Sequence, residues 1–152
     1  MMQTRLAIGV LLFLLLLVPV GCAKKVPQLT EVEGVVLLGG QPLPHASISF
    51  NPTGSDLPSE AVGVAVTDGE GKFKLTTGGK PGAVPGEHVI TVVEGPPPED
   101  TRGEDAQEKL SKFRASLKNR PIPLKYASVN KSDAKITVKT DQKEYKIELN
   151  NR

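Results

Sequence analysis

The side chains that could do chemistry are few in this sequence and stand far apart. The chain has two histidines, His45 and His88, and one cysteine, Cys22. Without a His-x-His pair or a second cysteine, the sequence predicts neither a zinc site nor a disulfide within the chain. Asp68 and Glu70 share a turn, but calcium needs more oxygen ligands than these two supply. We therefore expect no metal and no cofactor.

Motifs for covalent or phosphate chemistry are also missing from the sequence. It holds no Gly-x-Ser-x-Gly elbow, and the Gly-Lys pair at 79–80 is followed by Pro81 instead of Ser or Thr. The acids Glu60, Glu87 and Glu94 are isolated from one another along the chain, so no carboxylate pair for glycoside hydrolysis is predicted. We predict a protein that is not an enzyme.

The charge balance gives no argument for a strongly anionic partner. The chain has 19 basic and 17 acidic residues, for a net charge of +2. One basic residue and no acid precede Cys22, so the remainder is nearly neutral and nucleic-acid binding is not expected. The 15 glycines and 13 prolines, with no Trp, are typical of an all-β protein with many turns.

The first 21 residues have the parts of a secretory signal peptide. A short segment that ends in Arg5 precedes an apolar run from Leu6 to Val20, and the small residue Gly21 follows. The run is shorter than the roughly 20 residues that span a bilayer as a helix. An uncleaved membrane anchor is the alternative, but Pro19 and Gly21 end the run and favour cleavage.

The sequence around Cys22 resembles the lipobox of bacterial lipoproteins, through Val20-Gly21-Cys22. The resemblance implies cleavage between Gly21 and Cys22, diacylglycerol on the Cys22 thiol, and fatty acyl chains such as palmitate that hold the protein to a membrane. Pro19 departs from the pattern, which prefers Leu there. Residues 22–29 become a lipidated tether, and Ala23 after the cysteine favours the outer membrane. The alternative is a free thiol in a secreted protein.

Apolar and polar residues alternate in short runs from Thr30 onward, which predicts β-strands. The predicted strands are 30–37, 46–50, 61–67, 72–75, 88–93, 136–138 and 145–149. Asp68 is expected to bond backbone amides across a tight turn, with Gly71 at positive φ, so that 61–75 forms a β-hairpin. No helix separates successive strands in a βαβ rhythm, which argues against a parallel sheet. We predict a Greek-key β-sandwich of seven to eight strands over residues 30–150.

One segment breaks the β pattern. Leu110, Phe113 and Leu117 recur at spacings of three and four, which predicts an amphipathic helix at about 104–119. The helix either packs its apolar stripe on the sandwich or presents it to a partner.

Several motifs resemble the carboxypeptidase regulatory-like domains, which belong with the transthyretin-like and prealbumin-like sandwiches. They are Thr30-x-Val32-x-Gly34-x-Val36, Gly40-Gln-Pro42-Leu43-x-x-Ala46-x-Ile48-x-Phe50-x-Pro52, Thr67-Asp68-x-x-Gly71-x-Phe73-x-Leu75, Pro85-Gly86-x-His88-x-Ile90-x-Val92 and Pro121-Ile-Pro-Leu-Lys-Tyr126. The resemblance covers about 30–149 and implies the fold. An enzymatic branch of this fold closes with Tyr-Arg-Gly-Ser, whereas this chain ends in Leu149-Asn-Asn-Arg152, so that activity is not implied.

The remaining question is what the sandwich binds. Phe50, Phe73, Phe113 and Tyr145 fall on apolar patterns and are predicted to lie in the core, whereas Tyr126 is the candidate for an exposed, ligand-binding ring. We expect a non-catalytic cell-envelope lipoprotein that mediates protein contacts or structural support at the membrane surface, with an envelope protein as partner. The alternative is a module that binds cell-wall glycan.

Overall fold

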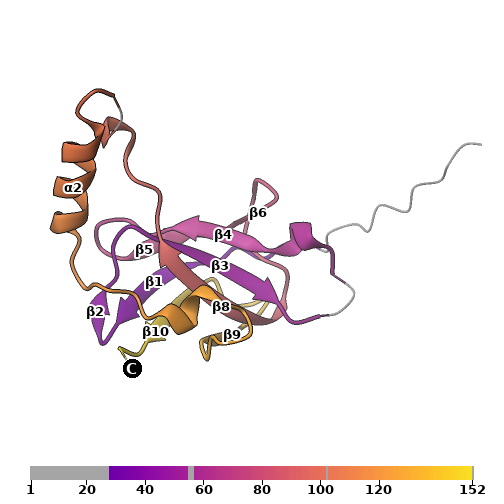
Figure 1. Cartoon of the computed structure of the whole chain (residues 1–152). Coiled ribbons are helices and arrows are strands. Elements are labelled where there is room, and N and C mark those ends of the chain that lie inside the picture. The colour runs from indigo at the N-terminus through magenta and orange to yellow at the C-terminus, as the bar shows by residue number, and fades with distance from the viewer. Residues whose placement is uncertain (1–27, 55–56, 102, 152) are drawn as a thin grey trace, which may run out of the picture.

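The computed structural model describes residues 28–54, 57–101 and 103–151 (Figure 1). The predicted signal peptide 1–21, its cleavage between Gly21 and Cys22, the lipidation of Cys22 and most of the tether lie outside the described residues. Within them the chain is mainly β and forms two sheets with one α-helix, an arrangement consistent with a β-sandwich.

Seven strands of the described part have three or more residues, in agreement with the seven to eight predicted. They are β1 (Glu33–Leu38), β3 (Ala46–Pro52), β4 (Gly63–Val66), β5 (Lys72–Lys74), β8 (Gly86–Glu94), β9 (Lys135–Val138) and β10 (Glu144–Leu149). Three two-residue strands supplement them: β2 (Gln41–Pro42), β6 (Thr76–Thr77) and β7 (Lys80–Pro81). The last two form a small hairpin in a segment that the sequence predicted as a loop.

The helical elements lie in the connections between strands. The α-helix is α2 (Ala106–Ser116), inside the predicted range 104–119. Short 3-10 turns are η2 (Ser59–Ala61), η3 (Glu99–Thr101) and η4 (Leu124–Ala127).

The smaller sheet is organised around β1. Antiparallel strands β5 and β2 share one side of β1, while β10 pairs with its other side from Glu33↔Glu144 to Leu38↔Leu149. The β1–β10 pairing is parallel, so the smaller sheet is mixed, whereas the sequence argued only against a parallel sheet. Parallel strands need a long connection. Here the whole of the chain between β1 and β10 supplies it, so no local βαβ signal is needed.

The larger sheet has the order β7-β6-β4-β3-β8-β9 and is antiparallel throughout. Strand β3 lies at its centre between β4 and β8, and Ser47–Phe50 of β3 pairs with both neighbours.

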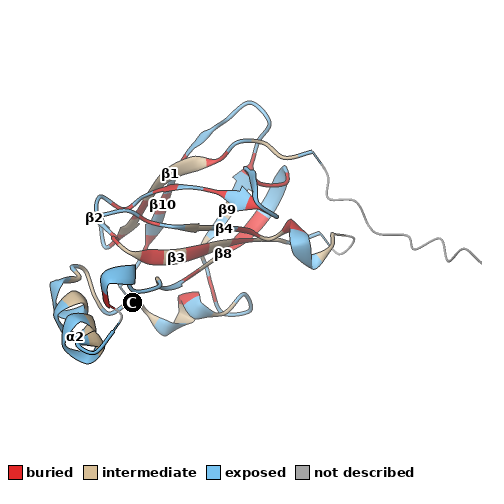
Figure 2. Cartoon of the chain, turned by 90° about the horizontal axis from the view of Figure 1, so that it is seen from above, coloured by how far each residue is buried: buried red, intermediate tan, exposed pale blue. Residues whose placement is uncertain are grey.

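The core fills the space between the two sheets. Figure 2 shows buried segments along the strands of both sheets. The buried side chains include Phe50 and Ile90 of the larger sheet and Ile147 of the smaller one. Phe73 and Tyr145 join them, in agreement with the sequence.

The predicted hairpin over 61–75 is wrong, because β4 belongs to the larger sheet and β5 to the smaller one. The turn between them forms as expected: Asp68 Oδ1 accepts the N–H groups of Glu70 (2.8 Å) and Lys72 (2.9 Å), and Gly71 has φ +75°. It carries the chain from one sheet to the other, however, and does not join two neighbours.

Thr67 anchors this crossing. Its hydroxyl accepts the Ala46 N–H (2.8 Å) and donates to the Leu43 carbonyl (2.7 Å), and only 2% of the residue is exposed. These bonds hold the end of β4 against the start of β3.

Gly34 permits the close approach of β1 to β10. A Cβ at this position would overlap the backbone carbonyl oxygen of Tyr145 on β10. A glycine inside a strand marks a bulge or a close approach of another backbone, and at Gly34 it is the close approach.

We expect Gly34→Ala to destabilise the protein by about 3 kcal/mol, since the added methyl must push β10 away from β1. Urea denaturation followed by circular dichroism measures the effect. The control is Gly69→Ala, where a Cβ meets no atom within 4 Å, and we expect a change of at most about 0.5 kcal/mol. Equal stability of the two variants would contradict the assigned β1–β10 contact.

Candidate interaction surface

The outward side chains of β3 and of the parts of β4 and β8 that pair with Ser47 and Ser49 form an uncharged surface. Since Ala46, Ile48 and Phe50 of β3 are buried, the residues between them point away from the core. The register places Ser47 between Val66 of β4 and Val93 of β8, and Ser49 between Val64 and Thr91. We call this set the neutral face: Ser47, Ser49, Val64, Val66, Thr91 and Val93.

The valines of the neutral face are unusually exposed. Val64, Val66 and Val93 are 48%, 47% and 44% exposed, and they are three of the five exposed large apolar side chains in the described part of the chain. The small serines between them leave the centre of the face flat. Clustered apolar side chains at a protein surface mark a site of interaction more often than scattered ones do.

The outer face of the smaller sheet is charged instead. The register places Val35 between Lys72 and Lys146, and Glu33 between Lys74 and Glu144. An open depression of about 900 Å³ lies on this face. Charges of both signs line it, so it offers no uniform potential for an anion or a cation.

The ionisable groups of the described residues do not form a cluster of metal ligands: no three His, Cys, Asp or Glu side chains among them come together. Near the charged depression, Lys143 lies 3.0 Å from Glu31, and this hydrogen bond and the charge of Glu31 raise the pKa of Lys143. Such exposed pairs contribute little to stability.

The two histidines serve the fold. His88 is fully buried, with Nε2 2.7 Å from the Val84 carbonyl oxygen and its ring against Phe50. Its Nδ1 has no hydrogen-bond partner among the described residues. His45 lies at the start of β3 with φ 51°, and its ring meets the Phe113 ring edge-to-face at 5.4 Å.

Tyr126, the predicted exposed ring, is buried. Its exposed fraction is 0%, its hydroxyl accepts the Asn150 N–H (2.8 Å), and the ammonium of Lys125 lies 4.8 Å from the ring centroid. Lys125 in turn donates to Asp133 (2.8 Å), which raises the pKa of Lys125 and lowers that of Asp133. The segment before η4 is proline-rich and has no alternation, so the sequence held no signal for the direction of this ring.

The helix α2 lies beside the two sheets and does not cover either of them (Figure 1). It stands beyond the end of the sheets that carries β2 (Figure 1), and none of its eleven residues, all within the described ranges, is buried (Figure 2). Phe113 was predicted as core but is half-buried, as are Leu110 and Leu117; the Phe113 ring contacts His45 at the start of β3. The stripe is therefore neither fully packed nor fully free.

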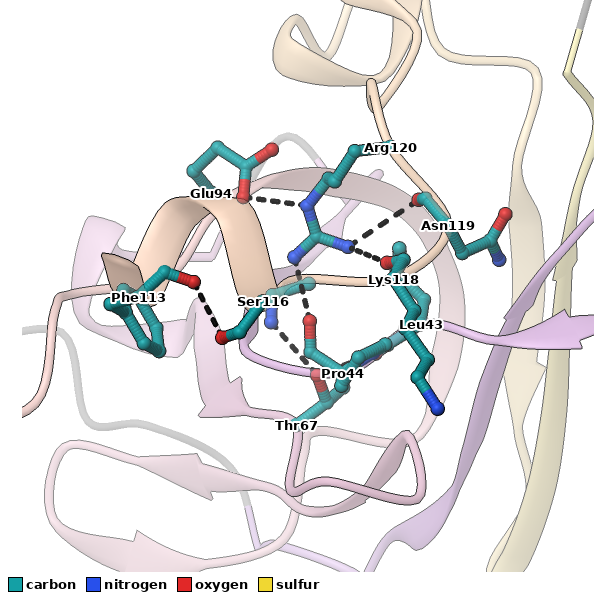
Figure 3. A network of polar contacts seen from close by, with 10 residues as sticks. Leu43, Pro44, Thr67, Glu94, Phe113, Ser116, Lys118, Asn119 and Arg120 are labelled. Carbon is teal, nitrogen blue, oxygen red and sulfur yellow. Dashed lines mark hydrogen bonds and ion pairs between the residues drawn. The ribbon is translucent and has the colours of Figure 1, made fainter. Parts of the chain in front are cut away.

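Residues after the helix fix it to the sandwich (Figure 3). Arg120 Nε donates to Glu94 Oε2 (2.8 Å) and Nη2 to the Pro44 carbonyl (2.6 Å). Asn119, at φ 62°, donates from Nδ2 to the carbonyl oxygens of Leu38 (2.8 Å) and Gln41 (3.0 Å). We call Asn119 and Arg120 the clamp. It brings the end of the insert to the turn between β1 and β2.

Comparison with known proteins found no match: neither a family model, nor a curated protein, nor a solved structure corresponds to this chain. A search of the described residues for a helix that could cross a bilayer also found none.

The clamp predicts that Arg120→Met releases α2. Hydrogen bonds to a charged group contribute roughly 1.5–3 kcal/mol, so local opening of the helix should increase about tenfold or more. Hydrogen–deuterium exchange measures this at the amides of 104–118, with Arg114→Met, an exposed arginine on α2 itself, as control. Unchanged exchange in Arg120→Met would show that the clamp does not hold the helix.

Proposed function

We propose that this chain is a non-catalytic lipoprotein of the bacterial cell envelope. The support is the apolar run 6–20 followed by Gly21 and Cys22, with no other cysteine in the chain. Lipid on Cys22 would hold the protein to a membrane, because each buried methylene contributes about 0.8 kcal/mol and two or more acyl chains anchor firmly. Ala23 after the cysteine favours the outer membrane.

The fold type that we propose is the Greek-key sandwich of the carboxypeptidase regulatory-like, or transthyretin-like, domains. The motifs that carry the resemblance coincide with elements of the structure. Gly34 lies where β1 approaches β10, Ala46–Pro52 is β3, and the Asp68–Gly71 turn and Gly86–Glu94 (β8) follow in the expected order.

The geometry also suggests how the sandwich would stand on its tether. Thr30 pairs with Ala83 just before the chain enters β1 at Glu33, whereas the clamp binds at Leu38, the other end of β1. Six residues of strand separate the two ends by about 17 Å. The insert would therefore lie at the end away from the membrane, with the neutral face on the side of the molecule.

The neutral face is the surface through which we propose that the sandwich binds a protein partner in the envelope. The exposure of Val64, Val66 and Val93 on one uncharged sheet face is the observation that carries this proposal. A partner that buried a charge against this face would lose hydration without gaining a counter-charge. We therefore expect a partner surface that is itself apolar and uncharged, and binding that depends little on salt.

Glycan binding is less well supported. Sugars commonly stack on exposed aromatic rings, and Tyr126, the candidate ring, is buried. None of the Phe or Tyr side chains among the described residues is exposed.

The test is chemical crosslinking in intact envelopes, followed by capture of the tagged full chain. We expect one defined envelope protein with the wild type, and at least a tenfold loss in Val66→Glu/Val93→Glu, since two charges would be buried against an apolar partner. Val129→Glu is the matched control, because Val129 is 46% exposed but lies outside the neutral face.

A further variant, Cys22→Ser, separates the tether from the docking surface. It should move the protein out of the membrane fraction and reduce capture in envelopes, while purified protein should still bind the identified partner. Capture of glycan alone, or equal capture by the Val66→Glu/Val93→Glu variant and its control, would contradict the proposal.

A further inference from the structure

The sheets leave several strand edges without a partner strand in the described part of the chain. Edges β2 and β7 have only two residues each, and each contains a proline. The outward side chains of β5 are Lys72 and Lys74, and the one charged residue of β9 is Lys135; such lysines discourage pairing with another copy. Edge β10 differs, because its outward side chains Glu144, Lys146 and Glu148 alternate in sign.

The backbone of β10 has donors and acceptors directed away from its sheet. Glu33 N–H donates to the Lys143 carbonyl (3.0 Å) and Gly39 N–H to the Leu149 carbonyl (2.9 Å). The backbone N–H and C=O groups of the odd-numbered residues of β10 therefore point toward β1. Successive peptide groups of a strand point to opposite sides. The N–H and C=O groups of Lys146 and Glu148 therefore point outward.

Both ends of this edge are already occupied. Asn150 N–H donates to the Tyr126 hydroxyl (2.8 Å), and Gln142 Nε2 donates to the Glu144 carbonyl (2.9 Å). The open section is thus short and centred on Ile147. A single short section discourages long aggregates but leaves room for one partner strand.

We propose that β10 pairs antiparallel with β10 of a second copy of this chain, about a two-fold axis at Ile147. This register places Lys146 opposite Glu148 of the other copy, and Glu148 opposite Lys146. Both pairs have their peptide groups directed toward the partner, so each is a hydrogen-bonded pair of an antiparallel ladder. Opposite charges directly across such a ladder stabilise it.

The alternation of charge makes this register self-complementary, which a two-fold dimer requires. Within one copy Lys146 Nζ lies 3.2 Å from Glu148 Oε2, but both side chains are more than half exposed and the pair is weak. In the dimer the same four charged groups would alternate across the joined strands. The smaller sheets of the two copies would become one continuous sheet, while the neutral faces would stay free.

The test uses sedimentation velocity of the purified full chain in mild detergent, over a wide range of concentration. We expect the wild type to dimerise. Lys146→Glu and Glu148→Lys, each alone, place like charges opposite each other at both pairs and should lower the association constant about tenfold or more. Lys74→Glu, the same charge change on β5, is the control and should dimerise as the wild type does.

The decisive arm is an equal mixture of Lys146→Glu and Glu148→Lys. Each variant repels its own kind, but a mixed pair has opposite charges at both positions, so association should return. An effect on folding within one copy cannot produce this rescue. A wild type that stays monomeric, or a mixture that associates no better than its components, would overturn the proposal. Val66→Glu/Val93→Glu should dimerise normally, which separates this interface from the neutral face.

Discussion

The structure depends on one constraint: two sheets share a single apolar core, so each strand commits every second side chain to the interior. Val36, Ile48, Phe50, Ile90 and Ile147 meet there from both sheets, and all are at most 4% exposed. The side chains between them are released from packing and can differ from one sheet to the other. Residues on the outer faces can therefore be selected for binding without a change in the core.

The two outer faces use this freedom differently. The smaller sheet alternates Lys and Glu around Val35, which keeps its surface hydrated and its β10 edge selective. The larger sheet places exposed valines beside serine and threonine. Exposing these apolar side chains to water is unfavourable, and a cluster of them is typical of an interaction site. We propose that a single domain thereby offers a surface for a partner and a separate edge for self-association.

Local structure could be predicted from the sequence, whereas long-range pairing could not. Period-two patterns located β3 and β8, and turn chemistry located the Asp68–Gly71 turn, because both signals lie within a few residues. Strand β4 pairs with β3 and β5 pairs with β1, in each case across a long stretch of the sequence, and no local pattern reports such pairing. The parallel β1–β10 pair also joins segments that are far apart in the sequence, so local patterns could not predict it. The neutral face depends on the register of β4, β3 and β8, so the sequence alone did not suggest it.

The central claim is that the neutral face contacts a partner in the envelope. Site-specific photocrosslinking in living cells tests it most directly, with the photoreactive residue at Ser47 in the neutral face or at Val35 on the outer face of the smaller sheet. The account predicts an adduct with one envelope protein from position 47 and none with that protein from position 35. Equal labelling of that protein from both positions, or labelling from position 35 alone, would contradict it.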